Sequence, residues 1–406
     1  MINLQGLFSL FRTGTNQYTK TNTSTYYNNF YNQSKDVYVT INNNEFELYK
    51  TTPQLATVIN RDARMLSNGL FKVKDLNGEV VEGNLFADDV LALLQNPNPF
   101  QSQVAFIQDY QIQKNIYGNA FMYFNRAFSS ALPSSIVNLP AAHTKIIQTG
   151  KIWTMTKIEE IIERYDVEQK DGSYAPFEVK DVLHTQIVNP DNPLLGLSPL
   201  YALTMPISNL RGAYGFRNRI ILKNGALGIL SSASKDASGG IPLSSTERTR
   251  IENQYTQDYG IGDEQNSVIM TGSPLSWQSM THETNKLELF REVDNDFKTI
   301  IDAYGHNQNI YSTEDSSKFN NMNESLKMVY QDRTIPEGES LCADLSERLG
   351  LIEKGMYLEL DYSHLAVMKE DEKAKAETTK LRSDALATLM VNGFTLDQAR
   401  EMVGLM

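Results

Sequence analysis

Two short stretches of the chain carry residue types that can do chemistry, and each lacks a part that its chemistry needs. In Gly150-Lys151-Ile152 the lysine is followed by isoleucine, whereas a phosphate-binding loop needs a Ser or Thr hydroxyl there to hold Mg²⁺. The run Gly196-Leu197-Ser198-Pro199-Leu200 begins like the elbow that presents a catalytic serine, but it has no closing glycine for the sharp turn. We therefore interpret Ser198 as a helix cap.

Possible metal ligands are equally incomplete. Asp294 and Asp296 lack the loop glycine and the distant glutamate of a calcium-binding hand, and we interpret them as part of a solvated helix face. The single cysteine, Cys342, excludes an intrachain disulfide and a cysteine-based zinc site. We expect no catalytic residue, no metal and no cofactor, which favours a role in assembly or binding. The histidines form no His-x-x-x-His pair and are expected to be structural: His143, His184, His282, His306 and His364.

Composition narrows the class of protein. The 406 residues are enough for two or three packed units, and 41% hydrophobic with 21% charged residues is ordinary for a globular protein. The net charge of −12 argues against a protein that grips DNA, because such proteins carry a basic patch that neutralises phosphates. No apolar run approaches the roughly 20 residues of a membrane-spanning helix, and residues 1–10 do not have the pattern of a signal peptide. We expect a reducing cytoplasm as the setting.

The first half of the chain has the pattern of a mixed α/β body. Residues 13–36 are polar with hardly an aliphatic side chain, which is typical of a flexible arm, and the β-branched run 37–41 favours a short strand. Caps, apolar spacing and an Asn-Gly turn predict further elements. These are helices over 52–68, 88–95 and 102–117, a hairpin over 70–82, and strands over 120–124 and 182–184.

Two long helices are predicted in the middle of the chain. The first begins at Ser198-Pro199, contains Pro206 and ends at Asn224-Gly225, which makes it about 26 residues or ~39 Å long. The second begins near Asn285, which forms a capping-box-like pair with a glutamate three residues later. One of its faces is apolar. Another face is polar and mostly acidic, and it consists of Glu288, Glu292, Asn295, Thr299 and Asp302.

A small lobe is predicted between these helices, and helical segments after them. The lobe has strand patterns at 228–231, 268–270 and 275–279, and a capping box, Ser244-Ser245-Thr246-Glu247, that opens a helix. A polar stretch over 307–323 follows the second long helix. The remainder is a helical region interrupted at Ile335-Pro336-Glu337-Gly338, a strand over 357–360 and a charged helical tail from Lys369.

Several local sequences, in this order and spacing, resemble those of portal proteins of long-tailed bacteriophages. The most specific is Gly196-Leu197-Ser198-Pro199-Leu200, with Asn224-Gly225-Ala226-Leu227-Gly228-Ile229-Leu230 about two dozen residues later. The others are Leu93-Leu94-Gln95-Asn96-Pro97-Asn98-Pro99, Tyr117-Gly118-Asn119-Ala120-Phe121 and Asp181-Val182-Leu183-His184. Family members often carry a Val-Pro pair soon after the second long helix, where this chain has Gly305-His306-Asn307.

The resemblance implies an α+β fold that assembles into a ring, usually of twelve subunits. A mixed α/β wing domain would lead into two long stem helices that bracket a small α/β clip lobe, and a helical crown would form the C-terminal part. The implied parts are a flexible N-terminal arm (1–45), the wing (46–196), stem helix 1 (197–224), the clip (225–284), stem helix 2 (285–306), a tunnel loop (307–323), a wing return of kinked helix and strand (324–366) and the crown (367–406).

The resemblance also implies a function and partners. A portal ring is not an enzyme; it occupies one capsid vertex, forms the channel for DNA packaging and ejection, and docks the terminase motor and the head–tail adaptor proteins. The implied partners are further copies of the chain, the major capsid and scaffold proteins, the terminase large subunit, the adaptors and double-stranded DNA bound without sequence preference. No membrane is implied. The expected location is the virion, with the host cytoplasm during assembly.

Site residues follow from the same resemblance. An acidic channel face would repel phosphates over roughly a Debye length of ~10 Å and leave no sticking points for moving DNA. The expected channel lining is Glu288, Glu292, Asn295, Asp302, Asn309, Lys318, Asn320 and Asn321. The expected docking surface of the clip is Arg248, Glu252, Tyr255 and Trp277.

Two other classes stay open at this stage. A nuclease or maturation protease of a phage head would need a clustered acidic or Ser/Lys/His constellation, and the sequence shows none. Another structural head or tail protein would not account for two long helices that bracket a compact lobe.

Overall fold

The protein is described by a computed structural model that places residues 36–37, 44–126, 132–149, 157–222, 228–233, 235–236, 239–240, 244–253, 275–279, 289–311, 319–392, 395 and 398. The chain divides into two compact units, which we call unit 1 (residues to Tyr201 and from Tyr304 onward) and unit 2 (Ala202–Ala303). The predicted mixture of helices and strands is confirmed. Most of the arm predicted over 1–45 lies outside the described residues.

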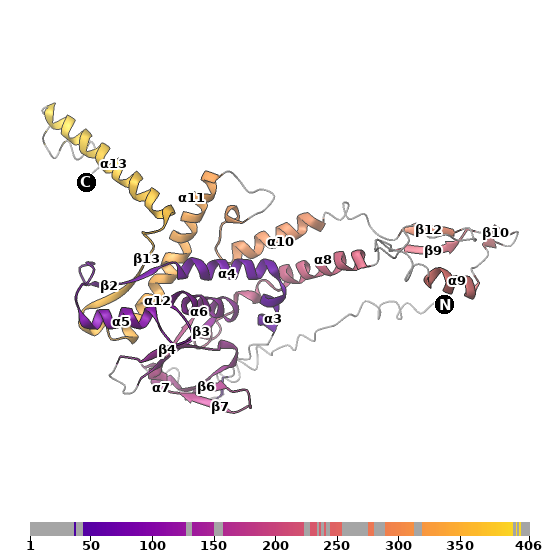
Figure 1. Cartoon of the computed structure of the whole chain (residues 1–406), viewed down its shortest axis with the longest axis horizontal. Helices are drawn as coiled ribbons and strands as arrows, with labels where there is room; N and C mark the ends of the chain where they lie inside the picture. The colour runs from indigo at the N-terminus through magenta and orange to yellow at the C-terminus, as the bar shows by residue number, and fades with distance from the viewer. Residues whose placement is uncertain are drawn as a thin grey trace. The chain divides into compact units, whose positions relative to one another are not determined.

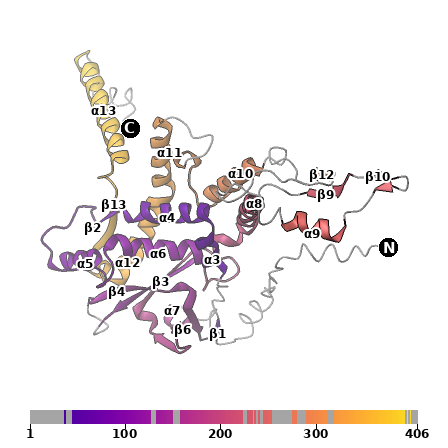
Figure 2. The same cartoon turned by 45° about the vertical axis from the view of Figure 1, so that its right-hand side comes forward.

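Unit 1 is built around the helices α4 (Pro53–Ser67) and α6 (Gln103–Tyr117), which lie side by side (Figure 2). α6 is capped by Ser102, whose hydroxyl accepts the Ala105 N–H, and it ends at Gly118 in the left-handed region with φ 72°. Both ends were predicted from these residues. The other helices of unit 1 are α3 (Asn44–Thr51), α5 (Leu85–Gln95), α7 (Ile158–Ile161), α11 (Phe319–Val329), α12 (Ile335–Arg348) and α13 (Ala366–Val391).

Among the described residues, three antiparallel sheets complete unit 1 (Figure 1). Their buried side chains form its core together with those of α4 and α6. The first sheet has the order β4 (Ser135–Leu139), β3 (Asn119–Asn125), β8 (Val182–Gln186). The second has the order β1 (Asp36–Val37), β5 (Thr144–Gln148), β6 (Ile162–Glu168), β7 (Tyr174–Phe177). The third pairs β2 (Leu70–Asp75) with β13 (Met356–Asp361). Phe121, Ile146, Ile162 and Val182 are each at most 1% exposed.

Two predicted boundaries near the N-terminal end of unit 1 need correction. The helix predicted from residue 88 begins at Leu85, because the Asn84 side chain accepts the N–H groups of the first helical residues and caps it there. The predicted hairpin turn exists, with Gly78 at φ 85°, but its return segment makes only an isolated bridge from Val80. The full partner of β2 is β13, whose alternate residues are buried and so offer an apolar face that the exposed Val80 segment cannot.

The helical region after residue 318 is continuous, whereas the sequence predicts an interruption at Pro336. α11 passes through a π-helical turn, Tyr330–Thr334, directly into α12. Pro336 lacks an N–H, and its ring would crowd the carbonyl four residues earlier in a regular α-helix. The wider π turn accommodates the proline without ending the helix. Residues 319–323, which the sequence places in a polar loop, belong to α11.

Unit 2 contains two helices that lie side by side, α8 (Thr204–Leu222) and α10 (Leu289–Ala303) (Figure 1). α8 starts later than predicted: Pro199–Tyr201 is a short 3-10 helix, and Pro206 falls in the first turn of α8, where no N–H is required. Ser198 still acts as a cap, because its hydroxyl accepts the Leu200 N–H at 3.2 Å.

The lobe of unit 2 is described in part. Both strands predicted at 228–231 and 275–279 are present, as β9 (Gly228–Ser232) and β12 (Leu275–Ser279), and they pair antiparallel with each other. α9 (Ser245–Asn253) begins with the predicted capping box, in which Ser244 and Glu247 exchange hydrogen bonds of 3.2 and 3.3 Å. A two-residue pair, β10 (Lys235–Asp236) and β11 (Gly239–Gly240), is also present. The strand predicted over 268–270 lies outside the described residues.

Three of the sequence stretches that resemble portal proteins meet at one junction in unit 1. The Asn119 side chain accepts the Gly196 N–H at 2.8 Å and lies 3.0 Å from His184 Nε2. The backbones approach so closely that a Cβ on Gly196 would lie 1.9 Å from the carbonyl oxygen of Gly118. The two glycines are therefore required by this contact between α6 and the segment that leads to α8.

The substitution Gly196→Ala is expected to destabilise the protein by on the order of 3 kcal/mol, because the added methyl group overlaps a backbone oxygen that cannot move freely. Chemical denaturation followed by circular dichroism measures the loss. Gly212→Ala on α8 is the matched control: a Cβ there meets nothing within 4 Å, so stability should rise by roughly 0.5–1 kcal/mol. Equal effects of the two substitutions would contradict the role of the junction.

Candidate functional site

The exposed face of α10 is the first part of the candidate site. Glu292, Asn295, Thr299 and Asp302 are exposed and follow one another at helical spacing. Ile300 and Ile301 on the other side of the helix are fully buried. The predicted division of this helix into an apolar and a polar face is confirmed for the residues that the structure describes.

Contacts with α8 fix how α10 is turned. Asp296 accepts a hydrogen bond from Asn209 of α8, and burial raises the pKa of this carboxyl above its ordinary value. Asp294 pairs with Lys298 one turn later at 2.9 Å. The solvated face expected for both aspartates therefore needs correction at Asp296, which packs against α8. Among the residues that the structure describes, no group of three or more His, Cys, Asp or Glu side chains could hold a metal ion.

The other predicted site residues are dispersed. Asn309 lies in a 3-10 helix, Gln308–Ile310, and its amide donates to the Ser325 hydroxyl of α11 at 3.2 Å. Arg248 and Glu252 are exposed on α9, and Trp277 lies in β12 opposite Leu230. Asn320 and Asn321 occupy the first turn of α11, and the description does not extend to their side chains or to Trp277's. Glu288, Lys318 and Tyr255 lie outside the described residues.

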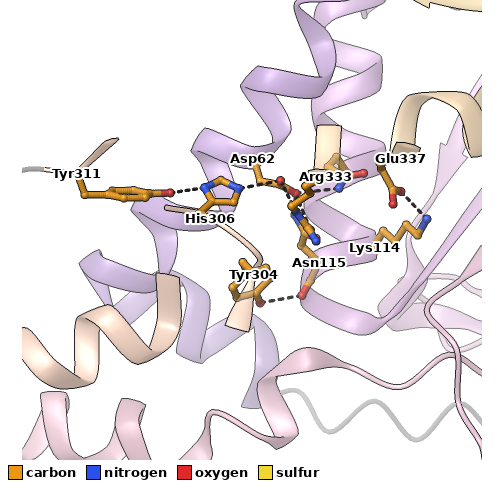
Figure 3. Close-up of polar contacts among 9 residues, drawn as sticks. Asp62, Lys114, Asn115, Tyr304, His306, Tyr311, Arg333 and Glu337 are labelled. Atoms are coloured by element: carbon orange, nitrogen blue, oxygen red, sulfur yellow. Dashed lines mark hydrogen bonds and ion pairs between the residues drawn. The ribbon is translucent and has the colours of Figure 1, made fainter. Parts of the chain in front are cut away.

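A buried carboxylate in unit 1, which the sequence did not reveal, is the second part of the site (Figure 3). Asp62 of α4 is 3% exposed and accepts hydrogen bonds from two amides of α6, Gln111 at 2.8 Å and Asn115 at 2.6 Å. It also accepts two from Arg333 of the π turn, at 2.7 and 3.0 Å. The bidentate pair provides the charge that a buried carboxylate needs.

His306 ties the segment after α10 to the same carboxylate. Its Nε2 lies 2.9 Å from Asp62 Oδ1, and its Nδ1 lies 2.6 Å from the hydroxyl of Tyr311. A carboxylate only accepts, so Nε2 carries a proton and donates it to Asp62, while Nδ1 and the Tyr311 hydroxyl share the second hydrogen bond. Two residues earlier, the Tyr304 hydroxyl donates to the Asn115 carbonyl at 3.0 Å. Residues 304–311 are thereby fixed to α4 and α6.

The electrostatics of this cluster favour the ionised form of Asp62. Burial by itself would raise the pKa of Asp62, but the charge of Arg333 and the hydrogen bonds from His306 and Arg333 outweigh it and hold that pKa well below its usual range. Burial raises the pKa of Tyr311, so its hydroxyl keeps its proton beside His306. Next to the cluster, Lys114 of α6 forms an ion pair with Glu337 of α12 at 2.5 Å.

One signal in the sequence could have revealed Asp62. It lies in the apolar stripe of α4, in line with Leu55, Ile59 and Leu66, which are each at most 1% exposed. A single charge on the buried face of a helix requires a partner. Its partners could not be read from the sequence, because His306 and Arg333 lie 244 and 271 residues away.

Comparison with solved structures places this fold in a known class. The neck of an empty gene transfer agent particle with C6 symmetry has a TM-score of 0.61 at 17% identity, covering 92% of this chain and 96% of that chain. The neck of the native particle with C12 symmetry has a TM-score of 0.59 at 16% identity, covering 90% and 94%. An HK97-family phage portal protein from Corynebacterium diphtheriae has a TM-score of 0.51 at 13% identity, covering 80% and 95%. The fold is that of portal proteins.

The sequence comparison gives the family itself. A family model described as phage portal protein matches residues 54–402, which is most of the chain. The chain therefore belongs to the phage portal protein family. An uncharacterised protein of Rickettsia bellii is 22% identical over 338 residues, which cover 82% of this chain and 81% of that protein. No described helix combines the length and the apolar character needed to cross a membrane.

Asp62→Asn is expected to destabilise unit 1 by about 3–5 kcal/mol, because it leaves the half-buried Arg333 guanidinium without its counter-charge. Asp62 has a lowered pKa in the folded state, so its contribution is complete above the ordinary value of 3.8 and declines as the pH falls below it. Denaturation curves at pH 7 and pH 3 measure both effects. If the free energy of unfolding differs between wild type and variant by as much at pH 3 as at pH 7, Asp62 has no ionic role. The control is Asp89→Asn, which removes an exposed charge from α5 and should change the free energy of unfolding little at either pH.

Proposed function

We propose that this chain is the subunit of a portal ring at one vertex of a phage or phage-like particle, and that the ring is the channel through which DNA enters and leaves. Family membership carries the proposal. A ring of twelve copies is supported by the C12 symmetry of the similar gene transfer agent neck. Placement in the virion is supported by the same assembly, which was solved within its particle.

The exposed face of α10 is the proposed channel lining in the stem. Asn295 and Thr299 lie near its centre, and Glu292 and Asp302 lie at its two margins. Repeated around a ring, these carboxylates would present a negative wall that DNA phosphates approach without binding. The net charge of −12 agrees with a channel that does not bind the DNA passing through it. In this proposal α8 and α10 are the stem helices, and residues 307–318, which precede α11, are the tunnel loop.

The lobe between the stem helices is the proposed binding surface for partner proteins. α9 exposes Arg248 and Glu252, two long charged side chains suited to the polar rim of a protein interface. Tyr255 and Trp277 are the proposed aromatic anchors for the terminase large subunit and, later, for head–tail adaptor proteins. Major capsid and scaffold proteins would meet unit 1, and the host cytoplasm would be the site of assembly. The proposed role is not enzymatic, and it needs no cofactor.

Electron microscopy of the purified protein tests the ring. Class averages are expected to show rings with a central hole and twelvefold symmetry. A particle that stays monomeric in sedimentation at high protein concentration would exclude the portal role.

The double substitution Asn295→Lys and Asp302→Lys tests the channel. It should slow packaging several-fold at low salt, because rings of lysine would bind passing phosphates, and added salt should relieve part of the defect. The readout is the fraction of DNA-filled particles and its salt dependence. Asp89→Lys, which adds two of the three positive charges but on the exposed side of α5, should leave packaging unchanged. If the double variant fills particles at the wild-type rate, this face does not line the channel.

A further inference from the structure

A second buried carboxyl group of unit 1, at the start of α3, lacks the partners that Asp62 has. The side chain of Glu45 is 6% exposed, and its Oε2 atom is buried without a hydrogen-bond partner among the described residues. None of the described lysine and arginine side chains pairs with Glu45. A buried carboxylate is stable only with a counter-charge or several donors, so the surroundings of Glu45 favour its neutral form.

Two tyrosines lie beside this carboxyl group and come from different elements. The hydroxyl of Tyr201, in the short 3-10 helix that precedes α8, forms a hydrogen bond with Glu45. Tyr117 is the last residue of α6, and burial together with the nearby charge of Glu45 raises the pKa of Tyr117 to about 12. Glu45 therefore lies where α3, the end of α6 and the segment that leads to α8 meet.

The other charged and titratable side chains near α3 have partners of their own. On α3 itself, Glu47 pairs with Lys50 at 2.7 Å, and Tyr49 donates to Asn60 at 2.7 Å. Apart from Tyr117, the titratable side chains of α4 and α6, which pack on α3, interact with groups other than Glu45. They are Arg61, Asp62, Arg64, Asp109, Tyr110 and Lys114. Among the described residues, no positive charge stabilises the ionised form of Glu45.

The proton on Glu45 consequently affects how stably α3 is docked. Burial raises the pKa of Glu45 from its ordinary value of 4.5 to about 7, and hydrogen bonds from its own N–H and from Tyr201 offset only part of that rise. A carboxyl group whose pKa is raised in the docked state supports docking fully below its ordinary value. That support is lost as the pH rises from 4.5 to about 7.

We propose that Glu45 is a proton-dependent latch for α3: in its neutral form it is buried beside Tyr117 and Tyr201, and in its ionised form it releases α3 from this junction. The segment that leads to α8 stays attached to α6, because the Ser198 hydroxyl donates to the Ile116 carbonyl at 2.5 Å. The latch gives unit 1 a response to pH next to the entry into α8. It needs no ring and is independent of the proposed function.

Hydrogen exchange of the full chain, followed by mass spectrometry of its peptides, tests the latch. Protection of the α3 amides, corrected for the intrinsic effect of pH on exchange, should fall by on the order of 100-fold between pH 5 and pH 8. The amides of α6 are the internal reference. Their protection should change far less, because the burial of α6 does not depend on Glu45. Equal protection of α3 at pH 5 and pH 8 would overturn the latch.

Two matched variants identify the titrating group. Glu45→Gln has the shape of the neutral acid and cannot ionise, so α3 should stay protected at both pH values. Glu47→Gln removes an exposed carboxyl group from the same helix and should show the same fall as wild type. A fall that persists in Glu45→Gln, or that disappears in Glu47→Gln, would assign the response to another group.

Tyr201→Phe supplies a test that does not alter the carboxyl group. The hydrogen bond from Tyr201 lowers the pKa of Glu45, so removal of the hydroxyl should raise that pKa. The loss of α3 protection should then continue to a higher pH than in wild type. If protection reaches its lower limit at the same pH in both proteins, Glu45 is not held through Tyr201 and the latch is wrong.

Discussion

The pairing of Asp62 with Arg333 is the interaction on which the arrangement of unit 1 depends. A carboxylate that is 3% exposed is tolerable only if other groups replace its hydration. Here the replacement comes from α6, from the π turn and from the segment after α10, all of which converge on one side chain of α4. Buried hydrogen bonds to a charge tolerate little displacement, so the cluster fixes the positions of these elements more narrowly than apolar packing would.

The π turn and Gly305 both direct a side chain toward Asp62. Gly305, with φ 68°, reverses the chain directly after α10 and lets His306 turn back toward Asp62. The π turn carries Arg333 to the opposite side of the same carboxylate. The chain thus leaves α10 through Tyr304 and His306, which are hydrogen-bonded to the buried residues Asn115 and Asp62.

Local signals predicted much of the fold, and long-range pairings escaped prediction. The limits of α6 follow from Ser102 and Gly118, which act on their immediate neighbours, and the exposed face of α10 follows from helical spacing alone. The start of α8 was placed too early because a 3-10 turn and an α-helix share the same Ser-Pro opening. Asp62 and the partner of β2 were missed because sequence spacing carries no information about residues that meet across more than 240 positions.

The pairing of β2 with β13 has a consequence for how the chain is made. Roughly 280 residues separate Asp75 from Met356. The edge of β2 that pairs with β13 therefore has no partner until the ribosome has synthesised all of these residues. At 5–20 residues per second this interval is about 15 to 60 seconds. Unit 2, which is continuous in sequence, can fold during that time, whereas unit 1 closes only after translation has passed β13. Nascent chains are therefore most exposed to aggregation or chaperone binding before the last tenth or so of the protein is made.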